Sequence, residues 1–153
     1  MIKIIDCNLF ECGAEVICHQ VNCKDNMDNG IAKQVKERFP RVYGAYKKMC
    51  GDADNSREVL LGKISDVAVS DDKNALIVCS LFGQDTYAGS GFAFADYQAL
   101  RTCLEQVRDK YKTKKIAIPY RMSCSLAGGD WRIVEEIILD VFKDTEITVC
   151  RFS

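Results

Sequence analysis

This 153-residue sequence lacks the features that mark several common classes of protein. Its 21 basic and 22 acidic residues leave a formal net charge of −1, whereas proteins that grip duplex nucleic acid through its phosphates usually carry a basic surplus. No apolar run approaches the roughly 20 residues that cross a bilayer. The first residues, Met1-Ile2-Lys3-Ile4-Ile5, do not form the pattern of a secretion signal. We therefore expect a cytoplasmic protein that does not bind a membrane.

The sequence also lacks a metal-binding pattern. It has nine cysteines, an odd number, with no C-x-x-C pair to begin a metal site. Several of them lie inside apolar runs, where a free thiol behaves as a small hydrophobic side chain. We expect no metal and no other cofactor, and reduced, mostly structural cysteines. The nine are Cys7, Cys12, Cys18, Cys23, Cys50, Cys79, Cys103, Cys124 and Cys150.

Histidine is almost absent, since His19 is the only one. A catalytic Cys-His pair with Cys18, Cys23 or Cys124 is one interpretation of it. Cys18 is a poor partner, because neighbours on a strand point to opposite faces. The hypothesis we favour is a packed strand histidine beside a binding cleft.

Strand-like and helix-like segments alternate along most of the chain. β-branched and apolar runs predict strands at 1–5, 15–21, 59–69, 75–82, 115–119 and 146–152. Apolar residues at helical spacing predict helices at 30–39 and 42–49, and two more that begin after Asp96 and Asp130. This order predicts an α/β fold of three layers, with a central sheet flanked by helices. Neither a repeat nor a linker divides the chain, so we expect one domain over residues 1–153.

Two loops that follow predicted strands have unusual compositions. They span 22–30 and 120–129, and they lead into helices through Gly30 and through Gly128-Gly129. In open α/β sheets ligands gather at this end of the strands. Glycine near a helix start lets backbone amides approach an anion. The alternative is that both loops simply cap their helices.

Taken together, the motifs of the chain resemble one family, the macrodomains. The similarity extends over almost the whole chain and is to the small bacterial and phage type, which includes the terminal ADP-ribose glutamate and thymidine hydrolases. The segments that carry it are Ile17-Cys18-His19-Gln20-Val21-Asn22-Cys23, Met27-x-x-Gly30-Ile31-Ala32-Lys33-Gln34, Phe39-Pro40, Leu81-Phe82-Gly83-Gln84, Ile118-Pro119-Tyr120 and Cys124-x-Leu126-Ala127-Gly128-Gly129-Asp130-Trp131.

The resemblance implies a mixed central sheet and a cleft for ADP-ribose or an ADP-ribosylated substrate. Nucleic acid is then a partner only as a modified substrate. We expect a monomer. The ligand-binding residues that it implies are Asn8 and Leu9 for adenine; Asn22, Asn26, Asp28, Gly30, Ile31 and Ala32 for the distal ribose; Gln84 at the end of the middle strand; Ser123, Cys124, Ser125, Leu126 and Ala127 for the diphosphate; and Phe152 for stacking on adenine.

Several positions depart from the family pattern. Asn8 stands where an acidic residue usually takes the adenine amine, so adenine meets a neutral acceptor. Asp28 adds a carboxylate near the distal ribose. Three glycines of the phosphate loop appear as Arg121, Ser123 and Ser125, and a side chain at a close approach costs on the order of 1 kcal/mol or more. These changes predict a cleft remodelled for another nucleotide, or a degraded one.

Catalysis is where the alternatives differ most. Related hydrolases use a lysine whose place falls on Gln84, which cannot form a covalent lysyl intermediate. Asp130 is the candidate general base, and its other role is that of helix cap. The leading hypothesis is a hydrolase of ADP-ribosyl linkages or of ADP-ribose 1″-phosphate. The alternatives are a non-catalytic nucleotide binder and an interaction protein with a vestigial cleft.

A run of basic residues surrounds Pro40. The solvated side of two helices explains it better than a binding patch for polyanions does. The residues are Lys33, Lys36, Arg38, Arg41, Lys47 and Lys48.

Overall fold

A computed structural model describes residues 2–28, 30–69, 75–86, 95–122 and 129–151. Within these ranges one six-stranded sheet has the order β1-β6-β5-β2-β4-β3. All neighbouring pairs are parallel except β3 and β4, which are antiparallel. The predicted mixed sheet is confirmed. Its strands are β1 (Ile2–Ile5), β2 (Val16–Val21), β3 (Ile64–Ala68), β4 (Ile77–Phe82), β5 (Ile116–Pro119) and β6 (Ile147–Cys150).

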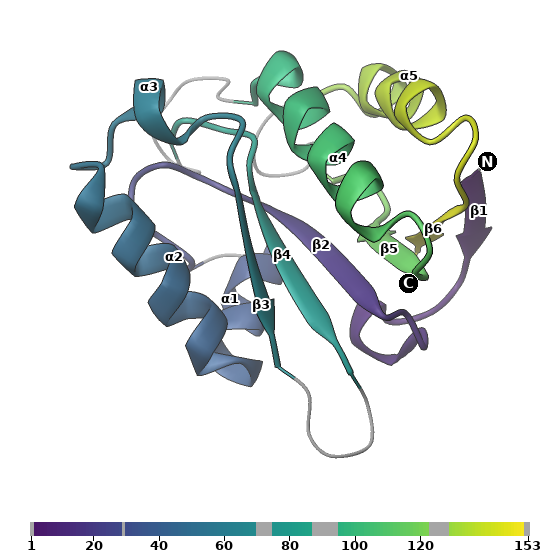
Figure 1. Cartoon of the computed structure of the whole chain (residues 1–153), viewed down its shortest axis with the longest axis horizontal. Coiled ribbons are helices and arrows are strands. Elements are labelled where there is room, and N and C mark those ends of the chain that lie inside the picture. The colour runs from purple at the N-terminus through teal and green to yellow at the C-terminus, as the bar shows by residue number, and fades with distance from the viewer. Residues whose placement is uncertain (1, 29, 70–74, 87–94, 123–128, 152–153) are drawn as a thin grey trace.

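Helices cover both faces of this sheet (Figure 1). One face packs against α4 and α5, and the other against α1, α2 and α3. Alternate residues of each strand enter the two cores, so that Cys18 belongs to the first and its neighbour Ile17 to the second. The helices are η1 (Leu9–Glu11, a 3₁₀ turn), α1 (Gly30–Arg38), α2 (Pro40–Asp52), α3 (Arg57–Leu60), α4 (Tyr97–Tyr111) and α5 (Trp131–Val141).

The predicted helix caps are present. Asp96 accepts a hydrogen bond from the backbone N–H of Ala99 at the start of α4, at 2.9 Å. Asp130 accepts one from the N–H of Arg132 at the start of α5, also at 2.9 Å. Each bond satisfies a donor that the first helical turn leaves without a partner. These caps fix where both helices begin.

The strand predicted over 59–69 is wrong at its start. The chain forms the short helix α3 there and enters β3 only at Ile64. The amide of Leu60 donates to the carbonyl of Ser56, which closes a helical turn and buries Leu60, while Val59 stays 45% exposed. Gly62, at φ +88°, then redirects the chain into the strand. The sequence between the strands predicted at 59–69 and 75–82, Ser70-Asp71-Asp72-Lys73-Asn74, is typical of a turn, and it lies outside the described residues.

The second helix is longer than the predicted 42–49. It begins at Pro40, where the missing N–H costs nothing because the first turn has no acceptor for it. It continues to Asp52, three residues beyond the predicted end. Tyr46, which the predicted range already contained, and Cys50, which the longer helix adds, are both fully buried. The hydroxyl of Tyr46 contacts Asn22 in the loop that follows β2.

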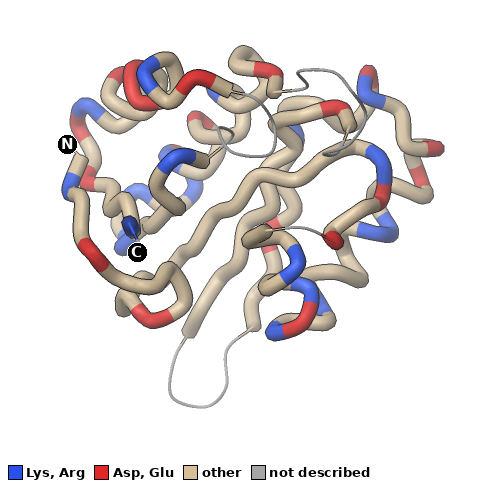
Figure 2. Tube along the Cα trace, turned by 180° about the vertical axis from the view of Figure 1, so that it is seen from behind, with Lys and Arg blue, Asp and Glu red and all other residues tan. Residues whose placement is uncertain are grey.

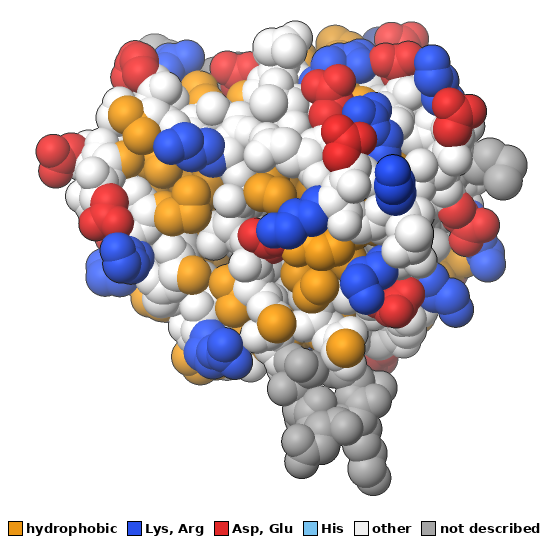
Figure 3. Space-filling view, viewed as in Figure 1, with side chains coloured by type: hydrophobic (Ala, Val, Ile, Leu, Met, Phe, Trp, Pro, Cys, Tyr) orange, Lys and Arg blue, Asp and Glu red, His pale blue; other side chains and the backbone are white. Residues whose placement is uncertain are grey.

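Charges of both signs are interspersed along the outer helices, whereas the central strands carry few (Figure 2). Lys36, Lys47 and Lys48 of the basic run each pair with an aspartate, which agrees with a solvated surface. On the face shown in Figure 3, exposed hydrophobic side chains form small patches between charged ones. Of the helices that the structure describes, none combines the length and apolar character needed to span a membrane.

Candidate functional site

The carboxyl ends of five strands meet at one edge of the sheet, because β1, β6, β5, β2 and β4 run in the same direction. The loops after these strands therefore converge. They carry most of the residues that the sequence singled out, and the site is built from them.

A cavity of about 260 Å³ lies at this edge. It is enclosed by the loop after β1, the start of α1 and the ends of β5 and β6. The structure thus brings together Asn8, Leu9 and Ile31, three residues predicted to bind ligand. Its lining residues are Asn8, Leu9, Phe10, Ile31, Gln34, Pro119, Tyr120 and Cys150.

Five of these lining residues were not predicted to bind ligand: Phe10, Gln34, Pro119, Tyr120 and Cys150. The sequence did mark Pro119 and Tyr120, because they belong to the quoted motif Ile118-Pro119-Tyr120 that precedes the phosphate loop. For Cys150 the only indication was its position at the end of the last predicted strand. Gln34 ends the quoted motif that begins at Met27, whereas no motif marked Phe10.

Two arginines stack over aromatic side chains at the rim of the cavity. The guanidinium of Arg38 lies 4.4 Å from the ring centre of Phe10. That of Arg151 lies 5.7 Å from the ring centre of Tyr120 and pairs with Asp6 at 2.8 Å. Tyr120 also meets Trp131 edge to face at 5.1 Å. These contacts hold the two aromatic walls in place.

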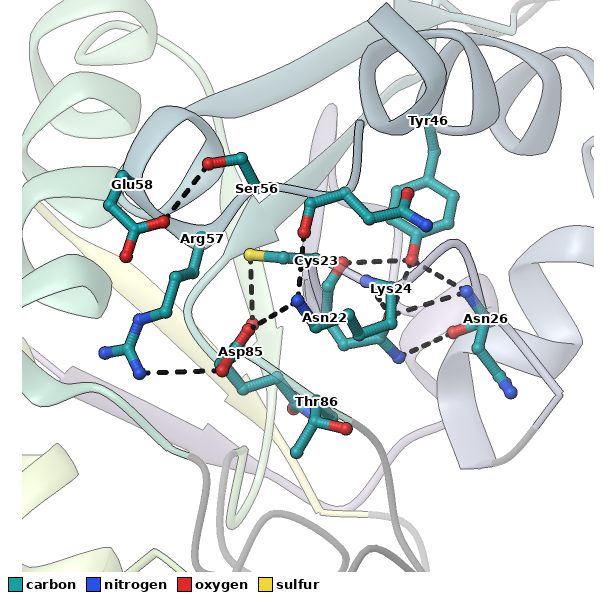
Figure 4. Close-up of polar contacts among 12 residues, drawn as sticks. Asn22, Cys23, Lys24, Asn26, Tyr46, Ser56, Arg57, Glu58, Asp85 and Thr86 are labelled. Carbon is teal, nitrogen blue, oxygen red and sulfur yellow. Dashed lines mark hydrogen bonds and ion pairs between the residues drawn. The ribbon is translucent and has the colours of Figure 1, made fainter. Parts of the chain in front are cut away.

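The loop after β2 is organised around Asn22 and Tyr46 (Figure 4). Asn22 is 5% exposed; its Nδ2 donates to the carbonyl of Asn26 at 2.7 Å, and its Oδ1 accepts from the amide of Lys24 at 2.9 Å. The hydroxyl of Tyr46 lies 2.8 Å from Oδ1 of Asn22, and the amide of Asn26 donates to that hydroxyl at 3.0 Å. Asn22 therefore shapes the loop from inside rather than projecting from it.

Ion pairs tie the same loop to the end of β4. Lys24 lies 3.2 Å from Asp85 and donates to the carbonyl of Asn55 at 2.9 Å. Arg57 contacts the other oxygen of Asp85 at 3.5 Å (Figure 4). The amide of Cys23 donates to the backbone carbonyl of Asp85. Asp85, which sequence reasoning missed, thus joins three parts of the chain.

The loop then turns into α1 through exposed residues. Gly30 has φ +58°, a conformation that other residues adopt only with strain. Asp28 is exposed and pairs with Lys36 at 3.0 Å. The positive charge of Lys36 therefore offsets the negative charge that Asp28 adds to this loop. Ala32 is half-buried and packs beside Ile31 against the core.

Gln84 forms a carboxamide pair with Gln20. Nε2 of Gln20 donates to Oε1 of Gln84 at 2.7 Å, and Nε2 of Gln84 donates to the carbonyl of Thr86 at 2.7 Å. The pair joins the ends of β2 and β4. Within the described residues, the position of the expected catalytic lysine is thus occupied by a neutral side chain held on both sides.

Asp130 is engaged by its own helix. Besides its cap, its carboxylate pairs with Arg132 at 3.3 Å, and its backbone amide donates to the hydroxyl of Tyr97. The hydrogen bond and charge of Arg132 lower the pKa of Asp130 below its ordinary value. The carboxylate is therefore ionised at neutral pH, and it is a weaker base than an unpaired aspartate.

The buried thiols and His19 are unsuited to nucleophilic catalysis. Burial raises the pKa of Cys23 to about 12, so its sulfur stays protonated and donates to the carbonyl of Gln84. Burial lowers the pKa of His19 to about 3, and its Nε2 lies 2.8 Å from the hydroxyl of Ser80. The packed histidine of our sequence prediction is confirmed. The cysteines Cys18, Cys23, Cys50, Cys79, Cys103 and Cys150 are free and buried.

Six predicted ligand-binding residues lie outside the described part of the chain. They are Ser123, Cys124, Ser125, Leu126, Ala127 and Phe152. Among the residues that are described, no group of His, Cys, Asp and Glu is arranged to hold a metal ion.

Comparisons with known proteins begin with sequence. No family model matches the chain. It is 28% identical over 137 residues to a DNA ADP-ribosyl glycohydrolase of Mycobacterium tuberculosis, which covers 89% of this chain and 37% of that protein. It is 26% identical over 118 residues to an ADP-ribose 1″-phosphate phosphatase of Saccharomyces cerevisiae, covering 77% of this chain and 63% of that protein. The chain thus spans well under half of the mycobacterial protein.

Solved structures agree over nearly the whole chain. A Bacteroides thetaiotaomicron protein of unknown function superposes with a TM-score of 0.83 at 27% identity, covering 99% of this chain and 98% of that one. The macrodomain of Mycobacterium tuberculosis DarG gives 0.79 at 24% identity, with 99% and 97% covered. Thermosipho africanus DarTG, solved in complex with ADP-ribose, gives 0.78 at 18% identity, with 98% and 41% covered. The chain therefore has the fold of a macrodomain, and its sequence is similar to proteins named as a DNA ADP-ribosyl glycohydrolase and an ADP-ribose 1″-phosphate phosphatase.

Proposed function

We propose that the chain binds ADP-ribose or a closely related nucleotide at the carboxyl edge of its sheet. The observation that carries this is the cavity between the loop after β1, α1 and the ends of β5 and β6. Its walls are mainly apolar and aromatic, which suits the faces of a nucleobase. The remainder of the ligand then extends toward the loop after β2. A fold neighbour solved with ADP-ribose supports this choice of ligand.

We propose further that the chain hydrolyses an ADP-ribosyl linkage on DNA or protein, or the phosphate ester of ADP-ribose 1″-phosphate. The mycobacterial relative is named as a glycohydrolase of ADP-ribosylated DNA. The yeast relative is named as a phosphatase of ADP-ribose 1″-phosphate. For a glycosidic linkage, water attacks C1″ of the distal ribose, the bond to the substrate atom breaks, and that atom leaves with the bonding electrons and gains a proton. Because Gln84 cannot act as a nucleophile, the attack is by water directly.

Asp130 is the proposed base for this step. Its ionised carboxylate accepts the proton of the attacking water and then returns it to solvent. Its position at the start of α5, at the carboxyl edge of the sheet, supports the assignment. An exposed cap is a modest base, so the proposal implies slow turnover.

The test is direct incubation of the purified chain with ADP-ribosylated single-stranded DNA, ADP-ribosylated protein and ADP-ribose 1″-phosphate. Free ADP-ribose is quantified by mass spectrometry, because all three reactions yield it. Release from one substrate, absent in a buffer control, supports hydrolysis. Release from none, with ADP-ribose bound, leaves a binding protein.

A non-catalytic binder is the second candidate, and one observation favours it. The position of the expected lysine holds Gln84, which is engaged with Gln20 and Thr86, and the proposed base Asp130 is paired with Arg132. In this case the chain sequesters or senses its nucleotide. Tight binding without turnover on any of the three substrates would identify it.

We also propose that the chain acts as a single domain over residues 1–153, as a monomer in the cytoplasm. Its uninterrupted sheet and its mixed surface charge support this. Light scattering during size-exclusion chromatography tests the oligomeric state, and fractionation of the producing cells tests the location.

A further inference from the structure

The cavity that we propose for the nucleobase has an unusual polar lining. Six of its eight lining side chains are apolar or aromatic, and the remaining two, Asn8 and Gln34, are both carboxamides. Among the residues that the structure describes, none with a charged side chain lines it. Apolar walls contact the face of any flat ring equally well. Discrimination between bases therefore depends on the hydrogen bonds that these two amides and the hydroxyl of Tyr120 offer to the ring edge.

Asn8 is fixed in place by the local backbone. It precedes the 3₁₀ turn η1, and its Oδ1 accepts a hydrogen bond from the amide of Phe10 at 2.8 Å. Because a backbone N–H can only donate, the side-chain atom that faces it must be the oxygen. The nitrogen, with two donor hydrogens, and the second lone pair of Oδ1 then remain for a ligand.

Gln34 differs in that it is exposed on α1, at the solvent side of the cavity. Its amide can rotate to present either a donor or an acceptor. Both carboxamides therefore offer donors and acceptors to the ring, as the hydroxyl of Tyr120 also can. A carboxylate at position 8 would cap Phe10 equally well, but its other oxygen could only accept.

We propose that Asn8 makes this cavity permissive toward the purine, so that it takes 6-oxopurine nucleotides as well as adenine nucleotides. This rests on the proposed function and specifies its ligand class. An all-acceptor carboxylate binds the 6-amino group of adenine and repels the 6-oxo group of hypoxanthine. The carboxamide of Asn8 donates to an oxo group or a ring nitrogen and accepts from an amine or a ring N–H.

The experiment compares two ligands that differ only at this edge of the ring. ADP-ribose and inosine 5′-diphosphate ribose share both riboses and the diphosphate, so the rest of the site contributes equally to each. Isothermal titration calorimetry gives the ratio of their dissociation constants. We expect the two dissociation constants of the wild-type chain to differ by less than about fivefold. Such a ratio is smaller than the effect of one charge-assisted hydrogen bond on affinity.

Asn8→Asp supplies the decisive comparison, because aspartate keeps the cap on Phe10 and the size of the side chain. We expect it to shift the ratio by fivefold or more toward ADP-ribose. Gln98→Glu, which adds the same charge on the exposed face of α4, is the control and should leave the ratio as in the wild type. Thermal unfolding checks that the variants are folded.

Two results overturn the inference while leaving the proposed function intact. One is a wild-type chain that already prefers ADP-ribose by more than fivefold. The other is an unchanged ratio in folded Asn8→Asp. If the wild-type chain binds neither nucleotide, the proposed function is overturned as well, so the two failures are distinguishable.

Discussion

The hydroxyl of Tyr46 lies 2.8 Å from Oδ1 of Asn22 and 2.9 Å from the backbone carbonyl of the same residue. Tyr46 belongs to α2 and is fully buried, with its ring stacked on Phe82 at 5.6 Å. A single phenol in the core thus sets the shape of the loop after β2. The loop proposed to contact the distal ribose is positioned from beneath by a residue that does not line the cleft.

Tyr46→Phe tests this support. The ring and its stacking stay, but the amide of Asn26 loses an acceptor and Asn22 loses a donor. We expect the free energy of unfolding to fall by about 1 to 3 kcal/mol and nucleotide binding to weaken, because a buried polar group is left unpaired. Urea unfolding and calorimetry measure the two effects.

Tyr43→Phe is the matched control on the same helix. Its ring is half-buried under Lys36, and among the described residues its hydroxyl makes no hydrogen bond. It should change stability by less than about 0.5 kcal/mol. Equal effects of the two substitutions would show that the hydroxyl of Tyr46 has no special role.

Gly83→Ala tests the Gln20–Gln84 pair. A methyl group at Gly83 would lie 2.5 Å from Oε1 of Gln20, the end of a flexible side chain. We expect Gln20 to move and to lose its bond to Gln84, with a stability cost on the order of 1 kcal/mol. We expect nucleotide binding to weaken by a larger free energy than the loss in the free energy of unfolding.

Gly44→Ala is its counterpart, since nothing lies within 4 Å of the added methyl group on α2. It should stabilise the protein by about 0.5 to 1 kcal/mol without an effect on binding. Identical binding by both alanine variants would contradict a role for the glutamine pair at the site.

The buried histidine predicts how stability depends on pH. In the unfolded chain His19 takes up a proton below its ordinary pKa of 6.5, whereas burial lowers the pKa in the folded chain to about 3. The unfolded state therefore binds more protons in this window, and stability falls as the pH falls. Between pH 7.5 and pH 5 the loss should be about 2 kcal/mol.

His19→Gln separates this effect from others. Because His19 is the only histidine, the variant has no imidazole to titrate in this window. Its free energy of unfolding should change little between pH 7.5 and pH 5. Parallel curves for variant and wild type would show that another group controls the acid sensitivity.

Asp130→Asn tests the proposed base without removing the helix cap, because asparagine caps as well as aspartate does. We expect the melting temperature to be unchanged and ADP-ribose release to fall at least a hundredfold, the lower range for a general base. Asp96→Asn, the same change at the cap of α4, is the control. An unchanged rate in Asp130→Asn would remove this residue from the mechanism.

The sequence predicts the fold well wherever the signals are local. Asp96 and Asp130 mark helix starts by their own chemistry, and the nearly apolar run before Tyr120 marks a buried strand. The prediction fails at Val59, where a β-branched residue suggests a strand but a turn closed by Ser56 buries Leu60 instead. Tertiary burial overrides propensity there.

The site is predicted less completely, because it depends on distant contacts. Asn8, Leu9 and Ile31 were predicted from the family resemblance, and they line one cavity. Phe10 and the ion pairs of Asp85 were not, since their partners are far along the chain. Asn22 was expected to face the ligand, yet its side chain is engaged inside the loop.

The most direct test of the account is a calorimetric titration of ADP-ribose into the wild-type chain, Ile31→Glu and Ile133→Glu. Ile31 lines the cavity, whereas Ile133 is 39% exposed on α5 and does not line it. We predict clear binding by the wild type and Ile133→Glu, and loss of binding by folded Ile31→Glu. No heat with the wild type, an affinity weaker than millimolar, or equal binding by both variants would contradict a nucleotide site in this cavity.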